Sequence, residues 1–206
     1  MKLYGNANSG HSYKVRLFLL LNEIEHEYQY VSLSLPREQR MPEFVKLSQF
    51  GEVPVLVDGD TVLCQSNAIL QYLAKKTQKM CGANSADWQA ITQWLCWEAN
   101  RLGMSLPNLR YMTLWDKQAS VEVLGYFKQR LLNDLSTLDG FLSQSEFLLS
   151  SGVSIADMSC SGYLFWLEQA NLSVADYPNI DRWLKSIAQL PHWLHPDEAM
   201  IGTERN

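Results

Sequence analysis

The feature that most constrains the fold is a hairpin pattern that runs directly into a helix, with a proline at its entrance. Residues 53–73 read VPVLVDGDTVLCQSNAILQYL. The apolar residues 55–57 favour a strand, residues 58–60 supply turn chemistry, and residues 61–64 form a return strand. Pro54 has no N–H to donate to a sheet, so it belongs at a strand entrance or on a sheet edge.

The first eighty residues alternate between strand and helix patterns. The expected elements are a strand at 2–4, a helix from Ser12, a strand at 28–33, a short helix at 42–47, the hairpin, and a helix from Ser66. A strand, a crossover helix and a second strand require a parallel pair, to which the hairpin adds an antiparallel pair. This order predicts a small α/β domain over residues 1–80.

After a linker near residues 82–85 the pattern becomes helical, and no strand signal follows. Long helices are expected at 86–114 and 120–142, a third from Ser154, and a fourth at 180–190. The expected fold class is therefore α/β plus all-α, with an α/β domain over 1–80 and an all-helical domain over 86–206.

Composition argues against several classes of partner. Apolar residues make up 47% of the 206 residues, which is enough for a proper core. The net charge is −5 and the basic residues are dispersed, whereas a nucleic-acid footprint needs clustered Lys and Arg. The apolar run at 17–21 is too short to span a bilayer, and the start lacks a signal-peptide pattern. We expect no nucleic acid, no membrane and a cytoplasmic location.

Cysteine and histidine spacing gives no metal signature. The four cysteines, at 64, 81, 96 and 160, form no C-x-x-C, and we interpret them as reduced thiols. His192 and His195 are separated by Trp193 and have no evident third ligand nearby. We expect no metal.

Four segments taken together resemble the soluble glutathione transferases over essentially the whole chain. They are SGHSYKVRL at 9–17, GEVPVLVDGD at 51–60, QSNAILQYL at 65–73 and GVSIAD at 152–157. The resemblance, to serine-activated members of bacterial type, implies a thioredoxin-like first domain and an all-helical second domain. It also implies glutathione as co-substrate, a homodimer, and a role in detoxification.

The resemblance gives the proline a role. In this family the bond before Pro54 is cis, and the N–H and C=O of Val53 pair with the cysteinyl backbone of glutathione as a short antiparallel strand does. The alternative is that Pro54 only starts an edge strand.

Two further contacts are implied at the ends of the tripeptide. Gln65 and Ser66 stand where the family binds the γ-glutamyl carboxylate, at a helix N-terminus that suits an anion. Ser66 is also a good N-cap by position and type. Gln39 and Arg40 stand where relatives meet the glycyl carboxylate, and a solvated surface charge is the alternative for Arg40.

Glu52 departs from the family, which has Lys, Gln or Arg just before the Val-Pro pair. A carboxylate there repels the glycyl carboxylate. Three explanations are open: Glu52 points away, it is bridged by Arg40, or it marks altered peptide selectivity.

The chemistry requires a thiolate, whereas a free cysteine thiol has a pKa of about 8.5. Aligned on the family, Ser9 is the hydroxyl that stabilises the sulfur anion, beside a helix N-terminus. Ser12 competes for that role and for capping. Tyr4 is a weaker candidate because it lies inside the first strand, and His11 is expected to be exposed. Cys64 is expected to be buried and inert.

The helical half contributes less. Ser154 and Asp157 form an Asp version of the capping box, a folding element. Tyr111 and Trp115 lie one turn apart and are the candidates for an aromatic wall on the electrophile side, with core packing as the alternative.

The leading hypothesis is a glutathione transferase that attacks small hydrophobic electrophiles. A peroxide or disulfide reductase with the same site is an alternative, and so is a non-catalytic binding module of the same fold.

Overall fold

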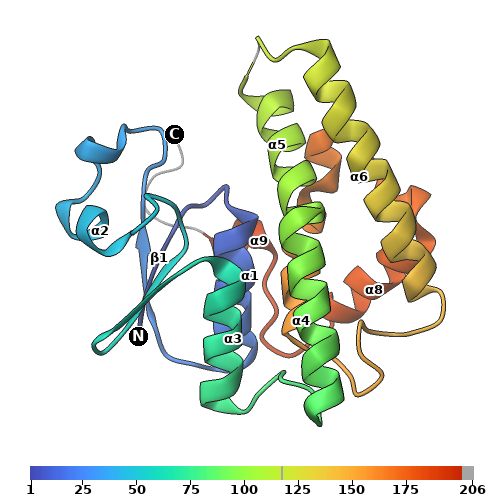
Figure 1. Cartoon of the computed structure of the whole chain (residues 1–206), viewed down its shortest axis with the longest axis horizontal. Helices are drawn as coiled ribbons and strands as arrows, with labels where there is room; N and C mark the ends of the chain where they lie inside the picture. Colours follow the sequence, from blue (N-terminus) through green and yellow to red (C-terminus); the bar gives the residue numbers. More distant parts are fainter. Residues whose placement is uncertain (117, 201–206) are drawn as a thin grey trace. The chain divides into compact units, whose positions relative to one another are not determined.

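The computed structural model describes residues 1–116 and 118–200 (Figure 1). They form two compact units. The first comprises Met1–Lys79 together with the stretch that begins at Leu190, and the second comprises Met80–Gln189. The C-terminal stretch thus packs with the N-terminal unit, although its sequence pattern is helical. The division into domains at 1–80 and 86–206 stays a prediction.

The first unit contains the expected α/β arrangement. Its elements are β1 (Lys2–Gly5), α1 (Gly10–Leu21), β2 (Glu27–Tyr30), the 3-10 helix η1 (Arg37–Gln39), α2 (Pro42–Leu47), β3 (Val55–Asp58), β4 (Thr61–Cys64), α3 (Ser66–Thr77) and α9 (Pro196–Ala199). The sheet order is β2-β1-β3-β4. β1 and β2 are parallel, whereas β3 is antiparallel to both β1 and β4. Because β3 lies inside the sheet, Pro54 does not begin an edge strand.

The strand register gathers four loops at one edge of the sheet. Tyr4 pairs with Val55, Val55 pairs with Cys64, and Gly5 pairs with Tyr30. The ends of β1, β2 and β4 and the start of β3 therefore share this edge, and α1 and α3 both begin there. We call it the loop edge, and it carries residues 6–9, 31–41, 53–54 and 65–66.

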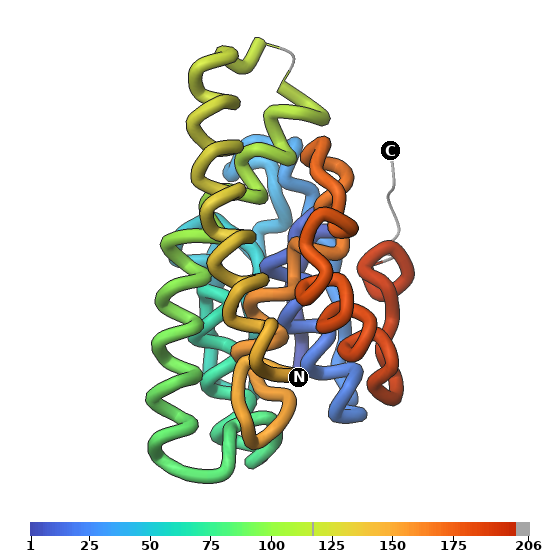
Figure 2. The backbone as a smooth tube through the Cα atoms, turned by 90° about the vertical axis from the view of Figure 1, so that its right-hand side faces the viewer, coloured from blue at the N-terminus to red at the C-terminus, as the bar shows by residue number. Residues whose placement is uncertain are grey.

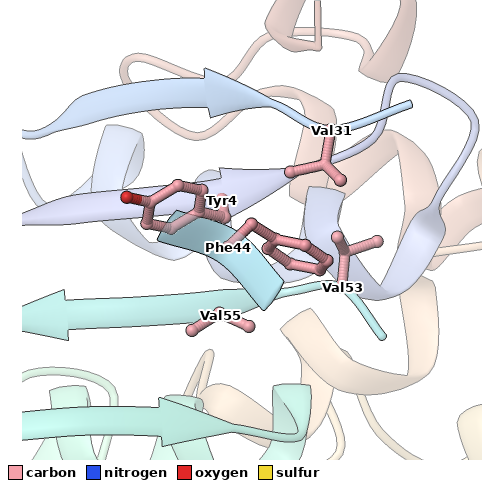
Figure 3. Close-up of a cluster of buried hydrophobic side chains, with 5 residues drawn as sticks. All are labelled: Tyr4, Val31, Phe44, Val53 and Val55. Atoms are coloured by element: carbon pink, nitrogen blue, oxygen red, sulfur yellow. The ribbon is translucent and has the colours of Figure 1, made fainter. Parts of the chain in front are cut away.

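The sheet is covered on both faces. Alternate side chains of a strand face opposite layers, so paired residues share a face. One face carries a buried cluster made of Tyr4, Val31, Phe44, Val53 and Val55 (Figure 3). The rings of Tyr4 and Phe44 pack with centroids 6.0 Å apart, which places α2 on this face. α1 and α3 lie side by side on the other face (Figure 1).

Within the described residues the second unit is all-helical. Its elements are α4 (Ser85–Asn100), α5 (Leu102–Leu114), α6 (Val121–Leu142), α7 (Ile155–Ser161), the 3-10 helices η2 (Leu164–Ala170) and η3 (Val174–Asp176), and α8 (Pro178–Ala188). α5 and α6 run side by side (Figure 2). None of the helices in the described ranges of the whole chain is long and apolar enough to cross a membrane.

The single helix expected over 86–114 is wrong, because the chain breaks at Arg101. This residue has φ −117° and ψ −92°, outside helical values. Its Nε donates to the buried Asp134 Oδ1 at 2.7 Å. From the same helix, α6, Arg130 Nη2 donates to the Asn100 carbonyl at 2.8 Å. Arg130 thus satisfies a backbone carbonyl at the end of α4, and Asp134 holds the side chain of Arg101.

The capping box is confirmed at the start of α7. Asp157 Oδ2 accepts from the backbone N–H of Ser154 at 2.8 Å. Asp157 Oδ1 accepts from Leu148 N and from Trp183 Nε1, both at 2.9 Å. This carboxylate therefore ties α7 to the preceding loop and to α8. The helix itself ends at Ser161, and the apolar segment that follows is a 3-10 helix rather than a continued α-helix.

Candidate functional site

Val53 presents unpartnered peptide groups at the loop edge. The bond between Val53 and Pro54 is cis, as the resemblance implied. The Val53 side chain is only 9% exposed and lies in the core cluster (Figure 3). Within the part of the chain that the structure describes, neither its N–H nor its C=O has a hydrogen-bond partner. In an antiparallel sheet, a residue can exchange two hydrogen bonds with the residue opposite it, one through its N–H and one through its C=O. Because both groups of Val53 are available, an extended peptide can pair with it in this way.

Ser9 stands at the start of α1, also at the loop edge. Its side chain is the N-cap, and Oγ accepts from the Ser12 N–H at 3.1 Å. A hydroxyl carries one donor and two acceptor positions. Because Ser9 accepts in this bond, its own proton remains to donate to an anion. The residue is 7% exposed, so such a bond forms in a largely dry environment.

The competing hydroxyls are placed less well. Ser12 is fully buried, and its Oγ accepts from the Asn6 N–H at 3.4 Å. Tyr4 is fully buried against Phe44 in the core cluster (Figure 3). Burial raises the pKa of the Tyr4 phenol, which disfavours its ionised form.

Gln65, not Ser66, is the capping position of α3, so the expectation of an N-cap at Ser66 is wrong. Ser66 is the first helical residue, and the Gln65 side chain makes no capping bond. Ser66 is 7% exposed, and among the described residues its hydroxyl has no hydrogen-bond partner. The N-terminal donors of α3 therefore lack a side-chain cap, which leaves them to water or to an anion.

The backbone at Gln65 is strained. Its φ is +69° with ψ 114°, a combination that non-glycine residues rarely adopt. A residue held in such a backbone conformation costs about 1–3 kcal/mol of stability. It persists where the surrounding structure enforces it, often where a residue contacts a ligand.

Glu52 neither points away nor is bridged by Arg40. Its Oε2 accepts from Gln65 Nε2 at 2.9 Å, so the carboxylate lies at the start of α3. Its backbone is fixed as well, because Ser48 Oγ donates to the Glu52 carbonyl at 2.9 Å.

Arg40 is occupied with backbone carbonyls rather than lying free on the surface. Its Nη1 donates to Gly51 O at 2.7 Å, Nε to Leu35 O at 3.0 Å, and Nη2 to Leu33 O at 3.4 Å. These bonds tie the loop after β2 to the loop before β3. Gln39, at the end of η1, is exposed.

Tyr111 and Trp115 form an exposed pair on α5 and at its C-terminal cap in the second unit, so core packing is not their role. They are 58% and 47% exposed, with ring centroids 5.9 Å apart. The guanidinium of buried Arg110 lies 5.1 Å from the Trp115 ring centroid and 4.3 Å from that of Trp166. This cation–π contact holds the Trp115 indole in place. A substrate role for the pair stays a prediction.

The remaining cysteine and histidine candidates have ordinary partners. Among the described residues none of the four cysteines forms a disulfide, and Cys64 is half-buried rather than buried as expected. His192 Nε2 lies 3.4 Å from Glu23 Oε1, and His195 Nδ1 accepts from the backbone N–H of Asp197. Among the described residues no group of three or more His, Cys, Asp or Glu is arranged to hold a metal.

Comparison with known proteins assigns the family. The model "Glutathione S-transferase, N-terminal domain" matches residues 1–75, and "Glutathione S-transferase, C-terminal domain" matches residues 98–186. The chain belongs to the glutathione S-transferase family. This confirms the resemblance to the family, together with a thioredoxin-like first domain and a helical second domain. The serine-activated, bacterial type stays a prediction.

Relatives in this family of enzymes cover nearly the whole chain. Glutathione S-transferase F10 of Arabidopsis thaliana is 28% identical over 86% of this chain and 88% of its own. The disulfide-bond oxidoreductase YfcG of Escherichia coli is 27% identical over 97% of this chain and 96% of its own. A Phanerochaete chrysosporium glutathione transferase solved with oxidized glutathione has a TM-score of 0.85 at 26% identity, covering 96% and 94% of the two chains.

Proposed function

We propose that this protein binds glutathione at the loop edge and ionises its thiol for attack on small hydrophobic electrophiles. The observation that carries the proposal is the pair of unpartnered peptide groups at Val53, beside the N-termini of α1 and α3. A peptide that carries a thiolate and a γ-glutamyl carboxylate matches this arrangement, because both helix N-termini favour negative charge.

Each part of glutathione has a partner in this proposal. The cysteinyl N–H and C=O pair with the C=O and N–H of Val53. The γ-glutamyl carboxylate accepts from the N-terminal donors of α3 at Ser66, next to Gln65. The glycyl carboxylate is met by Gln39 and Arg40. The Arg40 guanidinium has five N–H donors, and three of its bonds go to carbonyls, so donors remain.

The chemistry follows from the placement of Ser9. The bound thiol loses its proton to solvent, and the thiolate accepts a hydrogen bond from Ser9 Oγ while facing the N-terminus of α1. Lowering the thiol pKa by about two units corresponds to about 2.7 kcal/mol of preferential thiolate stabilisation. The thiolate then forms a bond to the electrophilic carbon, and the leaving group departs with its electron pair.

The remaining features are carried over from the family. Tyr111 and Trp115 supply apolar surface for the electrophile. We also propose a homodimer in the cytoplasm, with detoxification of electrophiles as its role and glutathione as co-substrate.

Titration of the bound thiol tests this function. The ultraviolet absorbance of the thiolate, followed against pH, is expected to show ionisation of bound glutathione below the pKa of about 8.5 of a free thiol. Ser9→Ala is expected to return the bound thiol pKa toward that value and to lower kcat/KM by about tenfold to a hundredfold.

The matched control is Ser120→Ala. Ser120 is likewise an N-cap whose Oγ accepts from a backbone N–H, but it starts α6 in the second unit. Its loss costs about 1 kcal/mol of stability and leaves the bound thiol pKa unchanged. An unshifted thiol in the wild type, despite tight binding, would favour the non-catalytic binding module.

Disulfide or peroxide reduction is the second candidate, and the similarity to the E. coli disulfide-bond oxidoreductase YfcG favours the disulfide substrate. In that reaction two glutathione molecules supply two electrons and become oxidized glutathione, while the substrate disulfide becomes two thiols. Assays with aryl halides, peroxides and mixed disulfides separate the candidates. Turnover of disulfides alone would replace transfer with reduction.

A further inference from the structure

We infer that Glu52 is the anionic partner of the α-ammonium group of the γ-glutamyl residue, and that it selects peptide thiols with a free amino group. This inference rests on the proposed function, because it concerns the same site. It assigns a specificity role to Glu52, which stands where the resemblance leads one to expect Lys, Gln or Arg.

The carboxylate of Glu52 is held at the start of α3. Its Oε2 accepts from Gln65 Nε2 at 2.9 Å. Its backbone is fixed by the bond from Ser48 Oγ to the Glu52 carbonyl and by the bond from Arg40 Nη1 to the Gly51 carbonyl. Among the described residues no basic side chain forms an ion pair with Glu52. Its charge is therefore uncompensated within this unit.

A second observation points to a ligand at the same place. Ser66 begins α3, is 7% exposed, and among the described residues its hydroxyl has no partner. The Ser66 oxygen still reaches solvent, so it is available to a ligand that binds at the start of α3. Ser66 follows Gln65 in the chain, and Glu52 accepts a hydrogen bond from the Gln65 side chain. The Ser66 hydroxyl and the Glu52 carboxylate therefore both lie next to Gln65.

The chemistry of an α-amino acid explains why both groups are needed. The γ-glutamyl residue bears its carboxylate and its ammonium on the same carbon. The N-terminus of α3 attracts the carboxylate but repels the ammonium. Gln65 is neutral, and its Nε2 is committed to Glu52, so its Oε1 faces ligand or solvent as an acceptor. Glu52 supplies a negative charge beside Gln65 that balances the ammonium.

The opposite assignment, exclusion of the glycyl carboxylate, fits the contacts less well. The glycyl end is assigned to Gln39 and Arg40, and Arg40 bonds to carbonyls of residues 33, 35 and 51 rather than to Glu52. The one side-chain bond of Glu52 runs to Gln65, on the γ-glutamyl side.

Calorimetric binding of three ligands to three proteins tests the inference. The ligands are glutathione, its des-amino analogue in which hydrogen replaces the ammonium, and the amide of its glycyl carboxylate. The proteins are the wild type, Glu52→Gln, and Asp60→Asn as a control at an exposed turn acid. Wild type and control are expected to bind glutathione about fivefold more tightly than the des-amino analogue. Glu52→Gln is expected to lose most of this preference and to keep its affinity for the analogue.

Two results would overturn the inference alone. One is an equal preference for glutathione over the des-amino analogue in wild type and Glu52→Gln. The other is a gain in affinity of Glu52→Gln for glutathione that the glycyl amide does not share, which would place Glu52 at the glycyl end. Both results leave glutathione binding intact. No glutathione binding by the wild type would instead remove the proposed function and this inference with it.

Discussion

At the residue scale, Gln65 shows how the site uses a costly conformation. Its positive φ brings the chain from β4 into α3 without a side-chain cap, while its amide bonds to Glu52. Glycine adopts positive φ without the steric penalty that other residues meet. Glycine would therefore adopt this backbone conformation at lower cost than Gln65 does.

Gln65→Gly is accordingly expected to raise the free energy of unfolding by up to about 1 kcal/mol. The same change is expected to weaken glutathione binding several-fold, because the amide and its contact with Glu52 are lost. Chemical denaturation and calorimetry measure the two quantities on one sample. A variant that is less stable than the wild type would contradict this expectation.

At the element scale, the hairpin turn is tied to the helix that follows it. Asp58 ends β3, accepts from Tyr72 Oη of α3 at 2.7 Å, and pairs with Lys76 one turn further along α3. The bond from Lys76 is the main reason that the pKa of Asp58 is lowered, and the Tyr72 bond adds to it. This cluster ties the hairpin turn to the C-terminal half of α3, at the end of the sheet opposite the loop edge.

The lowered pKa of Asp58 predicts a pH dependence. The fold favours the ionised carboxylate, so its contribution is fully present above the unfolded pKa of 3.8 and is lost as pH falls through the lower folded value. Lys76 is partly exposed, so solvent screening keeps the contribution under about 1 kcal/mol. Asp58→Asn is expected to flatten this part of the stability–pH curve, whereas Asp60→Asn leaves it unchanged. An unchanged curve for Asp58→Asn would contradict the assignment.

Local patterns predicted most of the first unit for a physical reason. Apolar spacing and the turn residues 58–60 act within a few residues, so the hairpin and its register follow from them. In that register Glu52 precedes β3 and Gln65 follows β4, so the two residues lie close together. The hydrogen bond between their side chains was not predicted from the sequence. The break at Arg101 was not predictable, because the groups that hold it come from α6, more than thirty residues away.

At the scale of the whole molecule, long-range contacts decide what local patterns cannot. The phenol of Tyr13 on α1 donates to the Leu194 carbonyl at 2.9 Å, which fastens the C-terminal stretch to the first unit. Partners separated by 181 positions leave no local signal in the chain. The site residues were a different case. Their roles came from the family resemblance, and the sheet register then explains why segments far apart in sequence meet at one edge.

The central claim is that the peptide groups of Val53 bind the backbone of glutathione, and a crystal structure of the complex tests it most directly. The account predicts that the cysteinyl C=O accepts from Val53 N–H and that the cysteinyl N–H donates to Val53 C=O, with the sulfur in hydrogen-bond range of Ser9 Oγ. Glutathione seated elsewhere, with the Val53 groups still unpartnered, would contradict the account.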